Sequence, residues 1–257
     1  MGCGMMAMKM LITDLDRTLL RTDKSVSDFT LDTLKKCRAR GIKIVFATAR
    51  PKNRVDIFPF AALADAVITD NGAVLYIENR VVNMFGIPPE TAKPFVGRLV
   101  GAFPDRRISI EYPHLKVANF DTSELWLAPI VNDIAHPLDA DATKMIVSGG
   151  AEIYAELTAL LPGDLYAQLC EGTLILIMHR LATKWNAIKK AAAYYGVPLS
   201  DTIAFGDDLN DIEMLQNCGI GVAVANALDE VKAAANGVCG SNEADGVARW
   251  IAEHLIS

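Results

Sequence analysis

The stretch that decides the fold runs from Lys9 to Leu20 and reads KMLITDLDRTLL. Its apolar run at 10–12 is short and bounded by polar residues, which is typical of a buried strand in a parallel sheet. Asp14 and Asp16 follow where this strand is expected to end, and residues two apart on a strand point to the same side. Like charges this close need compensation, which a bound divalent cation supplies. The alternative is a solvated turn, since Asp and Thr also favour turns.

The next segments repeat the strand pattern. Residues 25–41 are expected to form a helix, with Ser27 or Asp28 as its N-cap and Gly41 as its stop. A second apolar run, IKIVFA at 42–47, follows and ends in Thr48. A strand, a helix and a strand in this order form a βαβ unit, which requires a parallel sheet.

Further elements of the same kind occur on both sides of the middle of the chain. Before it, we expect a helix near 54–63, a strand at 66–69 and a hairpin of 73–77 with 81–82. After it, we expect helices at 184–196, 212–217, 227–235 and 247–255, and strands at 203–205, 220–224 and near Val238. The sequence therefore predicts the α/β class, with a Rossmann-like doubly wound parallel sheet built from residues 1–82 and 181–257.

The middle of the chain, residues 83–180, has a different texture. Prolines are frequent, and short strands (108–112, 144–147, 165–169, 174–178) mix with helical stretches (91–103, 152–161). We interpret it as an inserted α+β cap domain. It contains seven Lys and Arg against twelve Asp and Glu, so it carries −5 of the chain's net charge of −6.

Polar clusters are expected at one edge of the predicted sheet. Asp14, Asp16 and Thr18 follow the first strand, Thr48 the second, and 207–211 (DDLND) a later one, while Lys184 opens a helix and 70–72 (DNG) forms a loop. Ligands of open α/β sheets bind at the carboxyl ends of the strands. Each cluster alone could be an ordinary turn, a solvated lysine or a helix cap. Together, four or five acids without a counter-ion would repel one another strongly.

The ordered series carries a resemblance. D-L-D-R-T-L at 14–19, A-T-A-R at 47–50, an isolated Lys184 opening a helix, and G-D-D-L-N-D at 206–211 resemble the four motifs of the haloacid dehalogenase-like hydrolases. The chain is similar in particular to their Cof-type sugar-phosphatase branch, in which an α+β cap lies between the second and third motifs. The segments 226–232 (NALDEVK) and 241–247 (SNEADGV) also resemble that branch.

The resemblance implies roles for particular residues. Asp14 would be the nucleophile that attacks phosphorus, and Asp16 would protonate the leaving group and then activate water. Mg²⁺ would bind the Asp14 carboxylate, the Asp16 backbone carbonyl and Asp207, with Asp211 as a further candidate ligand or support. Thr48 and Lys184 would bind and neutralise the phosphoryl group. The residues expected on the substrate or phosphate side are Leu15, Arg17, Thr18, Ala49, Arg50, Asn71 and Asn210.

Two positions depart from the family pattern, which often has glycine where Arg17 and Trp185 stand. Arg17 places a large cation beside the nucleophile and could contact substrate or point away. Trp185 could form a wall of the site or pack in the core, and the core is the simpler interpretation. Neither position removes a group that the resemblance makes catalytic.

Composition limits the remaining functions. No apolar run approaches the roughly 18 residues of a membrane helix. Residues before Lys9 read as an irregular leader without the features of a secretory signal. Five cysteines form no C-x-x-C pair and four histidines no H-x-x-H pair, which indicates free thiols in the cytoplasm and argues against zinc. The acidic balance disfavours nucleic acid.

The expected partner is therefore a small phosphorylated metabolite, in particular a sugar phosphate, and neither nucleic acid nor a membrane. The protein is expected to be a monomer or a homodimer. The leading hypothesis is a Mg²⁺-dependent phosphatase. The alternatives are a phosphotransferase or mutase on the same scaffold, a dehalogenase, which would have no use for Asp16 or a metal, and a catalytically silent binding module.

Overall fold

The computed structural model describes residues 8–121, 130–131, 133–170 and 172–256. They fold into two compact units. Of the described residues, the core unit comprises 8–50, 54–83 and 183–256, and the inserted unit comprises 51–53 and those within 84–182. The leader expected before Lys9 lies, apart from Met8, outside the described residues.

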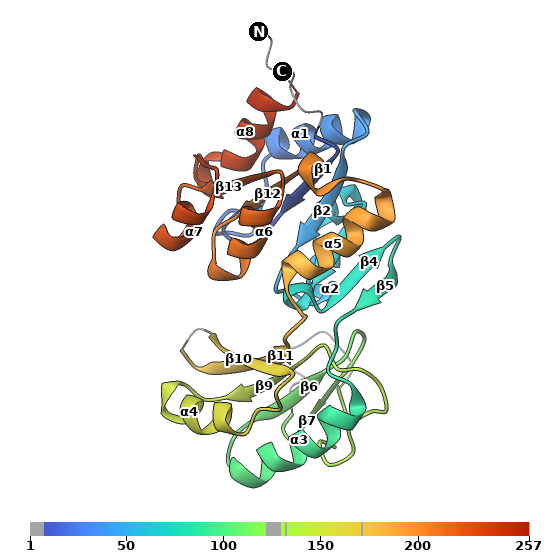
Figure 1. The fold of residues 1–257 in the computed structure, drawn as a ribbon, viewed down its shortest axis with the longest axis vertical. Coiled ribbons are helices and arrows are strands. Elements are labelled where there is room, and N and C mark those ends of the chain that lie inside the picture. The colour runs from blue at the N-terminus through green and yellow to red at the C-terminus, as the bar shows by residue number, and fades with distance from the viewer. Residues whose placement is uncertain (1–7, 122–129, 132, 171, 257) are drawn as a thin grey trace. The chain divides into compact units, whose positions relative to one another are not determined.

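The core unit is built on an eight-stranded sheet in the order β14-β13-β12-β1-β2-β3-β4-β5 (Figure 1). Its strands are β1 (Met10–Thr13), β2 (Lys43–Ala47), β3 (Ala66–Thr69), β4 (Val74–Ile77), β5 (Arg80–Met84), β12 (Thr202–Gly206), β13 (Ile220–Val224) and β14 (Gly237–Cys239). The strands from β14 to β3 pair in parallel, and β4 pairs antiparallel with β3. The predicted α/β class with a Rossmann-like sheet is confirmed.

Helices cover both faces of this sheet. They are α1 (Asp28–Ala39), α2 (Lys52–Asp56), α5 (Lys184–Tyr195), α6 (Ile212–Asn217), α7 (Asp229–Ala234) and α8 (Gly246–His254), of which the short α2 straddles the boundary of the two units. α1 packs beside α8, and α5 packs beside α6, on opposite faces (Figure 1). β1 lies between β12 and β2 in this sheet, and all four of its residues are buried. The loop that follows β1 therefore starts from a fixed position.

Capping residues define the helices that flank the site. Ser27 is the N-cap of α1, and its side chain accepts a hydrogen bond from the Thr30 backbone. Thr183 caps α5 in the same way by accepting from Asn186, so Lys184 is the first residue of the helix. α5 ends at Gly196, whose φ of 65° lies in the left-handed region that glycine adopts without strain.

One predicted helix is wrong as a continuous element. The stretch 54–63 is divided into α2, which ends at Asp56, and a separate 3-10 helix at Pro59–Leu63. Phe58 between them is extended, because a residue that precedes proline is disfavoured in the helical region. The apolar spacing of 54–63 did not reveal this break.

In its described residues, the inserted unit forms a six-stranded sheet in the order β10-β11-β9-β6-β7-β8 with two helices. Its elements are α3 (Pro89–Ala102), β6 (Ile108–Glu111), β7 (Lys116–Ala118), β8 (Ile130–Val131), β9 (Lys144–Ser148), α4 (Ala151–Ala159), β10 (Leu165–Cys170) and β11 (Leu174–His179). Phe95 and Leu99 of α3 pack with Ile110, Met145 and Ile177 of the sheet in one buried cluster. β7 and β8 were not predicted, because two or three residues are too few for an alternating pattern.

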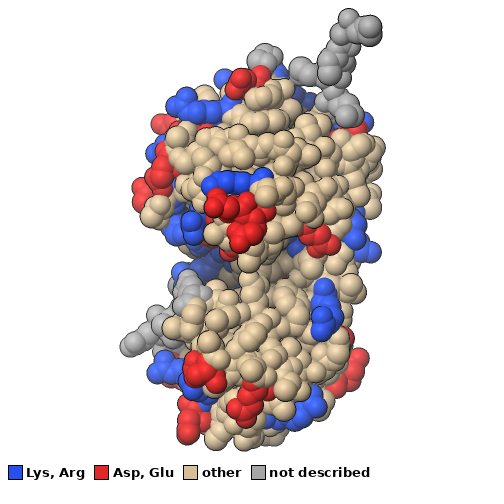
Figure 2. All heavy atoms as spheres, turned by 60° about the vertical axis from the view of Figure 1, so that its left-hand side comes forward, with Lys and Arg blue, Asp and Glu red and all other residues tan. Residues whose placement is uncertain are grey.

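The other face of this sheet carries a buried ion cluster. Glu111 is directly opposite Lys116 on β7 and Lys144 on β9. Its carboxylate accepts a hydrogen bond from Lys116 and lies 3.5 Å from the Lys144 ammonium. All three residues are buried. On the molecular face in Figure 2, by contrast, acidic and basic side chains are interspersed among uncharged ones.

Candidate active site

The carboxyl ends of neighbouring strands bring the site together. Thr13, the last residue of β1, is in register with Phe46 of β2 and Phe205 of β12. Asp14 therefore emerges between Ala47-Thr48 and Gly206-Asp207, and its backbone N–H donates to the Phe205 carbonyl at 3.0 Å. Parallel pairing thus brings three of the predicted motifs to one edge of the sheet.

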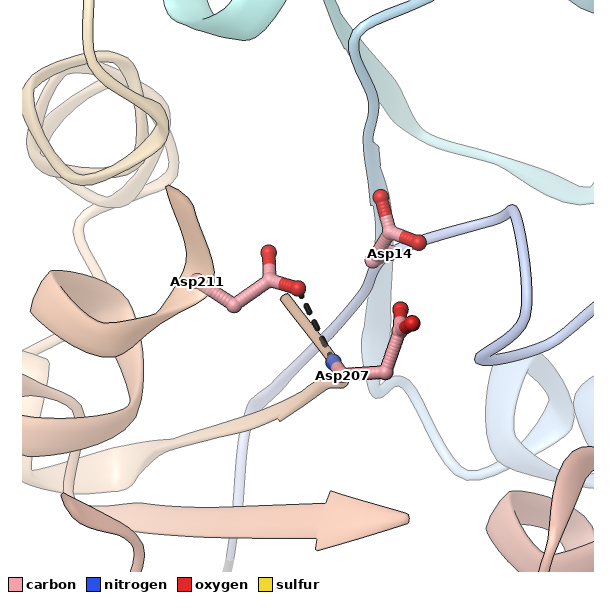
Figure 3. A group of neighbouring side chains, drawn as sticks. All are labelled: Asp14, Asp207 and Asp211. Atoms are coloured by element: carbon pink, nitrogen blue, oxygen red, sulfur yellow. Dashed lines mark hydrogen bonds between the residues drawn. The ribbon is translucent and has the colours of Figure 1, made fainter. Parts of the chain in front are cut away.

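Three carboxylates converge at this edge. Asp14, Asp207 and Asp211 each offer an oxygen, and these oxygens lie within 4.8 Å of one another. Figure 3 shows the Asp14 and Asp207 carboxylates beside each other, with Asp211 approaching from the start of the next helix. All three residues are buried. The Thr18 hydroxyl donates to Asp207 Oδ1 at 2.7 Å, so the loop after β1 also holds the acid after β12.

Lys184 joins two of these acids. Its Nζ donates to Asp14 Oδ1 at 2.6 Å and to Asp211 Oδ1 at 2.7 Å. The lysine is 1% exposed. Burial by itself would lower the pKa of Lys184, but its two carboxylate partners raise that pKa above the ordinary value, so the side chain is a fixed cation.

Asp211 is occupied by supporting contacts. While Oδ1 accepts from Lys184, Oδ2 accepts from the backbone N–H groups of Asp207 at 2.9 Å and Asp208 at 3.1 Å (Figure 3). A Cβ on Gly206 would lie 2.5 Å from Asp211 Cβ, so only glycine fits there. These contacts favour a supporting role for Asp211, which holds both the loop and Lys184 in place. Asp208 is exposed and caps the turn at 209–211.

Burial disfavours the ionised forms of Asp14 and Asp207. Burial raises the pKa of Asp14 to about 8, although Lys184 opposes the shift, and raises the pKa of Asp207 to about 6. A divalent cation would favour the ionised forms of both groups. Carboxylate and carbonyl oxygens are the ligands that Mg²⁺ prefers. The donor set therefore fits a hard cation.

Asp16 lies in a different environment from Asp14. Its carboxylate accepts two hydrogen bonds from Arg50, from Nε at 2.6 Å and Nη2 at 2.7 Å, and a third from Lys24 Nζ at 2.8 Å. Partial burial acts to raise the pKa of Asp16, but these bonds hold that pKa below its ordinary value. The predicted phosphate-side residue Arg50 is thus bound to the predicted acid, and Lys24 is a contact that the motif did not indicate.

The remaining predicted residues surround this centre. Thr48 is buried, and its hydroxyl accepts from the Arg50 backbone. Leu15 has a fully buried side chain, so only its backbone could meet a ligand. Ala49 is exposed. Asn210 donates from Nδ2 to Asn71 Oδ1 at 2.8 Å, which links two loops that lie 139 residues apart in the chain.

The two departures from the family pattern have structural explanations. Arg17 has a φ of 61°, a left-handed conformation that explains why glycine is common there. Its Nε lies 3.7 Å from Asp207 Oδ2, and its carbonyl accepts from Asn226 Nδ2 at 2.7 Å. Trp185 is 8% exposed and belongs to the buried residues, as the simpler interpretation predicted.

The loop after β1 is held by residues that sequence reasoning had not assigned. Asn226 Oδ1 accepts from the Asn242 backbone, and Asn242 Nδ2 donates to the Leu20 carbonyl at 3.0 Å. Asn226 begins the segment 226–232, and Asn242 lies in the segment 241–247. Their position in these segments was the available signal, although no role could be inferred from it.

The fold and this cluster define an α/β enzyme with a candidate cation site at the carboxyl edge of its sheet. The chain belongs to the haloacid dehalogenase-like hydrolases, whose family profile it matches over residues 11–251, and within them it is a Cof-type phosphatase. The resemblance inferred from the motifs is confirmed.

Named relatives are phosphatases of small phosphorylated metabolites. The chain is 29% identical over 271 residues to the 5-amino-6-(5-phospho-D-ribitylamino)uracil phosphatase YitU of Bacillus subtilis, covering 94% of this chain and 96% of that protein. It is 28% identical over 283 residues to the pyridoxal phosphate phosphatase YbhA of Escherichia coli, covering 98% and 100%. Among solved structures, the superfamily phosphatase BT1666 from Bacteroides thetaiotaomicron has a TM-score of 0.85 and 26% identity, covering 100% of this chain and 98% of that chain.

Proposed function

We propose that the protein is a Mg²⁺-dependent phosphatase that hydrolyses small phosphate monoesters, in particular sugar phosphates, through a phosphorylated Asp14. The observation that carries the proposal is the buried cluster in which Lys184 bonds Asp14 and Asp211 beside Asp207. No helix in the described part of the chain is long and apolar enough to cross a membrane, and the four described cysteines are free thiols. The free thiols fit a cytoplasmic location, which we propose as well.

In the proposed reaction, an Asp14 oxygen forms a bond to phosphorus while the ester P–O bond breaks. The leaving alkoxide takes a proton from Asp16. Water, deprotonated by Asp16, then attacks phosphorus, which releases inorganic phosphate and regenerates the Asp14 carboxylate. Dividing one displacement into two steps lowers each barrier, and general acid–base help of this kind contributes about 10²–10⁴-fold.

Asp16 must leave its present partners to act in this way. Its carboxylate is held by Arg50 and Lys24, and a carboxylate in such contacts does not carry a proton. We infer that Arg50 exchanges Asp16 for the phosphoryl oxygens when substrate binds, which combines its predicted phosphate role with its contact to Asp16. The buried Thr48 at the same strand end would hydrogen-bond the phosphoryl group.

The proposed metal ligands are the Asp14 carboxylate, the Asp16 backbone carbonyl and Asp207. When bound, the cation would neutralise the phosphoryl oxygens and orient the ester for in-line attack. Asp211 supports the site rather than serving as a ligand, because both of its oxygens already accept hydrogen bonds.

The substrate class rests on the relatives. YitU and YbhA are named for a ribityl phosphate and pyridoxal phosphate, which are both small monophosphates, and we extend that class to this chain. A phosphotransferase would use the same groups with a second hydroxyl in place of water, so product analysis with an added sugar acceptor separates the two activities. Free inorganic phosphate as the sole phosphorus product supports hydrolysis.

The central test replaces Asp14 with Asn, because an amide is a poor nucleophile. We expect Asp14→Asn to abolish Mg²⁺-dependent phosphatase activity, and Asp32→Asn, an exposed acid paired with Lys35 on α1, to leave it unchanged. Mass spectrometry of acid-quenched wild-type enzyme should find the phosphoryl group on the peptide that contains Asp14. Substantial turnover by purified Asp14→Asn, or full activity after exhaustive chelation, would contradict the proposal.

A further inference from the structure

The turn Asp70-Asn71-Gly72 after β3 has an unusual backbone. Its three residues have φ values of 51°, 56° and 102°, all in the left-handed half of conformational space. Asp70 is not glycine, so the conformation costs free energy that the surroundings must supply. The turn is also buried, with Asp70 at 3% and Asn71 at 5% exposure. Strain in a buried turn requires strong contacts on several sides.

Those contacts reach three of the four motif segments. The backbone N–H of Asp70 donates to the Arg50 carbonyl at 3.0 Å, and that of Asn71 donates to the Thr48 carbonyl at 3.1 Å. The Asn71 side chain accepts from Asn210, the residue before Asp211. The turn therefore ties the segment after β2 to the loop after β12.

The third contact is with the start of α5. A Cβ on Gly72 would lie 2.1 Å from the Thr183 carbonyl oxygen and 2.7 Å from the Lys184 nitrogen, so the two backbones touch. The Thr183 carbonyl also accepts the first hydrogen bond of α5, from Ala187. Any displacement here would move the origin of the Lys184 side chain.

We propose that the turn 70–72 is a positioning element of the active site: Gly72 sets the place of Lys184, and Asn71 sets the loop that carries Asp211. The proposal rests on the proposed function and adds residues to it. It gives Asn71 a positioning role, which acts through the hydrogen bond from Asn210. Because Lys184 must meet both Asp14 and Asp211, an error in either contact would misplace the charge, and a misplacement of about 1 Å can cost roughly 10²-fold in rate.

The first test uses the full-length protein and compares Gly72, which packs against the start of α5, with Gly196, which ends α5. Gly72→Ala adds a Cβ against Thr183, whereas Gly196→Ala adds one in open space at a left-handed position with φ 65°. We expect Gly72→Ala to lower kcat at least tenfold with KM for a hexose monophosphate changed less than threefold, and Gly196→Ala to keep kcat within twofold. Equal kcat values for the two variants would overturn the proposal.

A second variant decides the case if Gly72→Ala does not fold. Asn71→Gly is compatible with the left-handed backbone and removes the side-chain amide that accepts from Asn210. We expect kcat to fall about threefold to tenfold at unchanged KM, and Asn210→Ala to add no further loss to it. A rise in KM alone would show that Asn71 binds substrate instead, and a wild-type kcat would show that the contact positions nothing.

A readout without turnover separates this proposal from the proposed function. The chain has three tryptophans, and Trp185 follows Lys184. In protein labelled with 5-fluorotryptophan, with its resonances assigned by Trp185→Phe, the Trp185 ¹⁹F signal should shift in Gly72→Ala and stay in place in Gly196→Ala. An unmoved signal overturns the positioning role even if the enzyme is active. A shifted signal in Gly72→Ala, together with a wild-type protein that hydrolyses no phosphate ester, would refute the proposed function but not the positioning role.

Discussion

The ammonium of Lys184 lies 2.6 Å from Oδ1 of Asp14, although 170 residues separate the two in the chain. The contact exists because β1 places Asp14 at the sheet edge and Thr183 starts α5 opposite it. Burial raises the pKa of Asp14, and Lys184 opposes that shift and so favours the ionised, nucleophilic form. Lys184 thus connects the fold directly to the proposed chemistry.

Replacing Lys184 with Met should damage both stability and activity. The substitution leaves Asp14 and Asp211 buried without their cation, and breaking a buried pair in this way costs about 3–5 kcal/mol. We expect a fall of at least roughly 10²-fold in kcat/KM, of the size found when a charge-stabilising group is lost. Thermal unfolding and steady-state kinetics measure the two effects. Lys190→Met, an exposed site on the same helix, is the control, and an equal loss there would contradict the assignment.

Metal removal should change how stability depends on pH. The pKa of Asp14 is raised from 3.8 to about 8 in the folded protein, so the folded state binds a proton that the unfolded state releases. The contribution of this group to stability is therefore full below pH 3.8 and is lost as the pH rises to about 8. Mg²⁺ binds the ionised form, so the increase in Tm that Mg²⁺ produces over EDTA should grow from pH 5 to pH 8.

The Asp14→Asn variant provides the control for this experiment, because an amide does not titrate. Its Tm in EDTA should fall less steeply with pH than that of the wild-type protein. A Mg²⁺ increment that is constant across the pH range would show that Asp14 ionisation and metal binding are not linked.

The sequence predicted the core better than the details of the site. Buried parallel strands and capped helices have strong local signals, so the helix begun by Lys184 and the strand at 220–224 were placed within a residue. The bond between Arg50 and Asp16, and the approach of Gly72 to Thr183, depend on how distant segments pack. Local pattern contains no information about such contacts. For the same reason the hydrogen bonds of Asp211 to Lys184 and to the 207–208 backbone became visible only in the structure.

The buried ion cluster of the inserted unit should make that unit sensitive to Glu111. Burial alone would raise the pKa of Glu111, but Lys144 and Lys116 hold that pKa below 4.5. Its contribution to stability is therefore full above about pH 4.5 and is lost as the pH falls through the lower folded value. We expect Glu111→Gln to destabilise the protein by about 3–5 kcal/mol at pH 7, and by less at pH 4.

Asp139→Asn makes the equivalent change, from an acid to its amide, at an exposed site. Asp139 pairs with Lys93 at the surface, where its side chain is 87% exposed, and such pairs contribute at most about 1 kcal/mol. Denaturant unfolding of both variants measures the difference. If the two variants lose equal stability, the cluster around Glu111 is not what holds the inserted unit.

The charges of the site should also select substrates by their number of phosphates. Lys184 is bonded to Asp14 and Asp211, and Arg50 and Lys24 are bonded to Asp16. Lys184 and Lys24 balance carboxylates, and Arg50, once it exchanges Asp16 for the phosphoryl oxygens, serves the first phosphate. Little positive charge beyond that of a bound Mg²⁺ is left for a second phosphate. Residues 83–180 add −5 to the chain, and a negative potential disfavours the approach of polyanions, although salt screens it beyond about 8 Å at physiological ionic strength.

We therefore expect hexose monophosphates to be hydrolysed with a higher kcat/KM than hexose bisphosphates or nucleoside triphosphates. The long-range part of the preference should weaken as salt is raised, because screening removes the potential of residues 83–180, whereas the part that comes from the occupied cations of the site should persist. Measuring kcat/KM for the three substrate classes at low and high salt separates the two. A preference for a polyphosphate that survives high salt would mean that the site holds a cation for a second phosphate, and Arg17, 3.7 Å from Asp207 and 64% exposed, would be the first residue to replace.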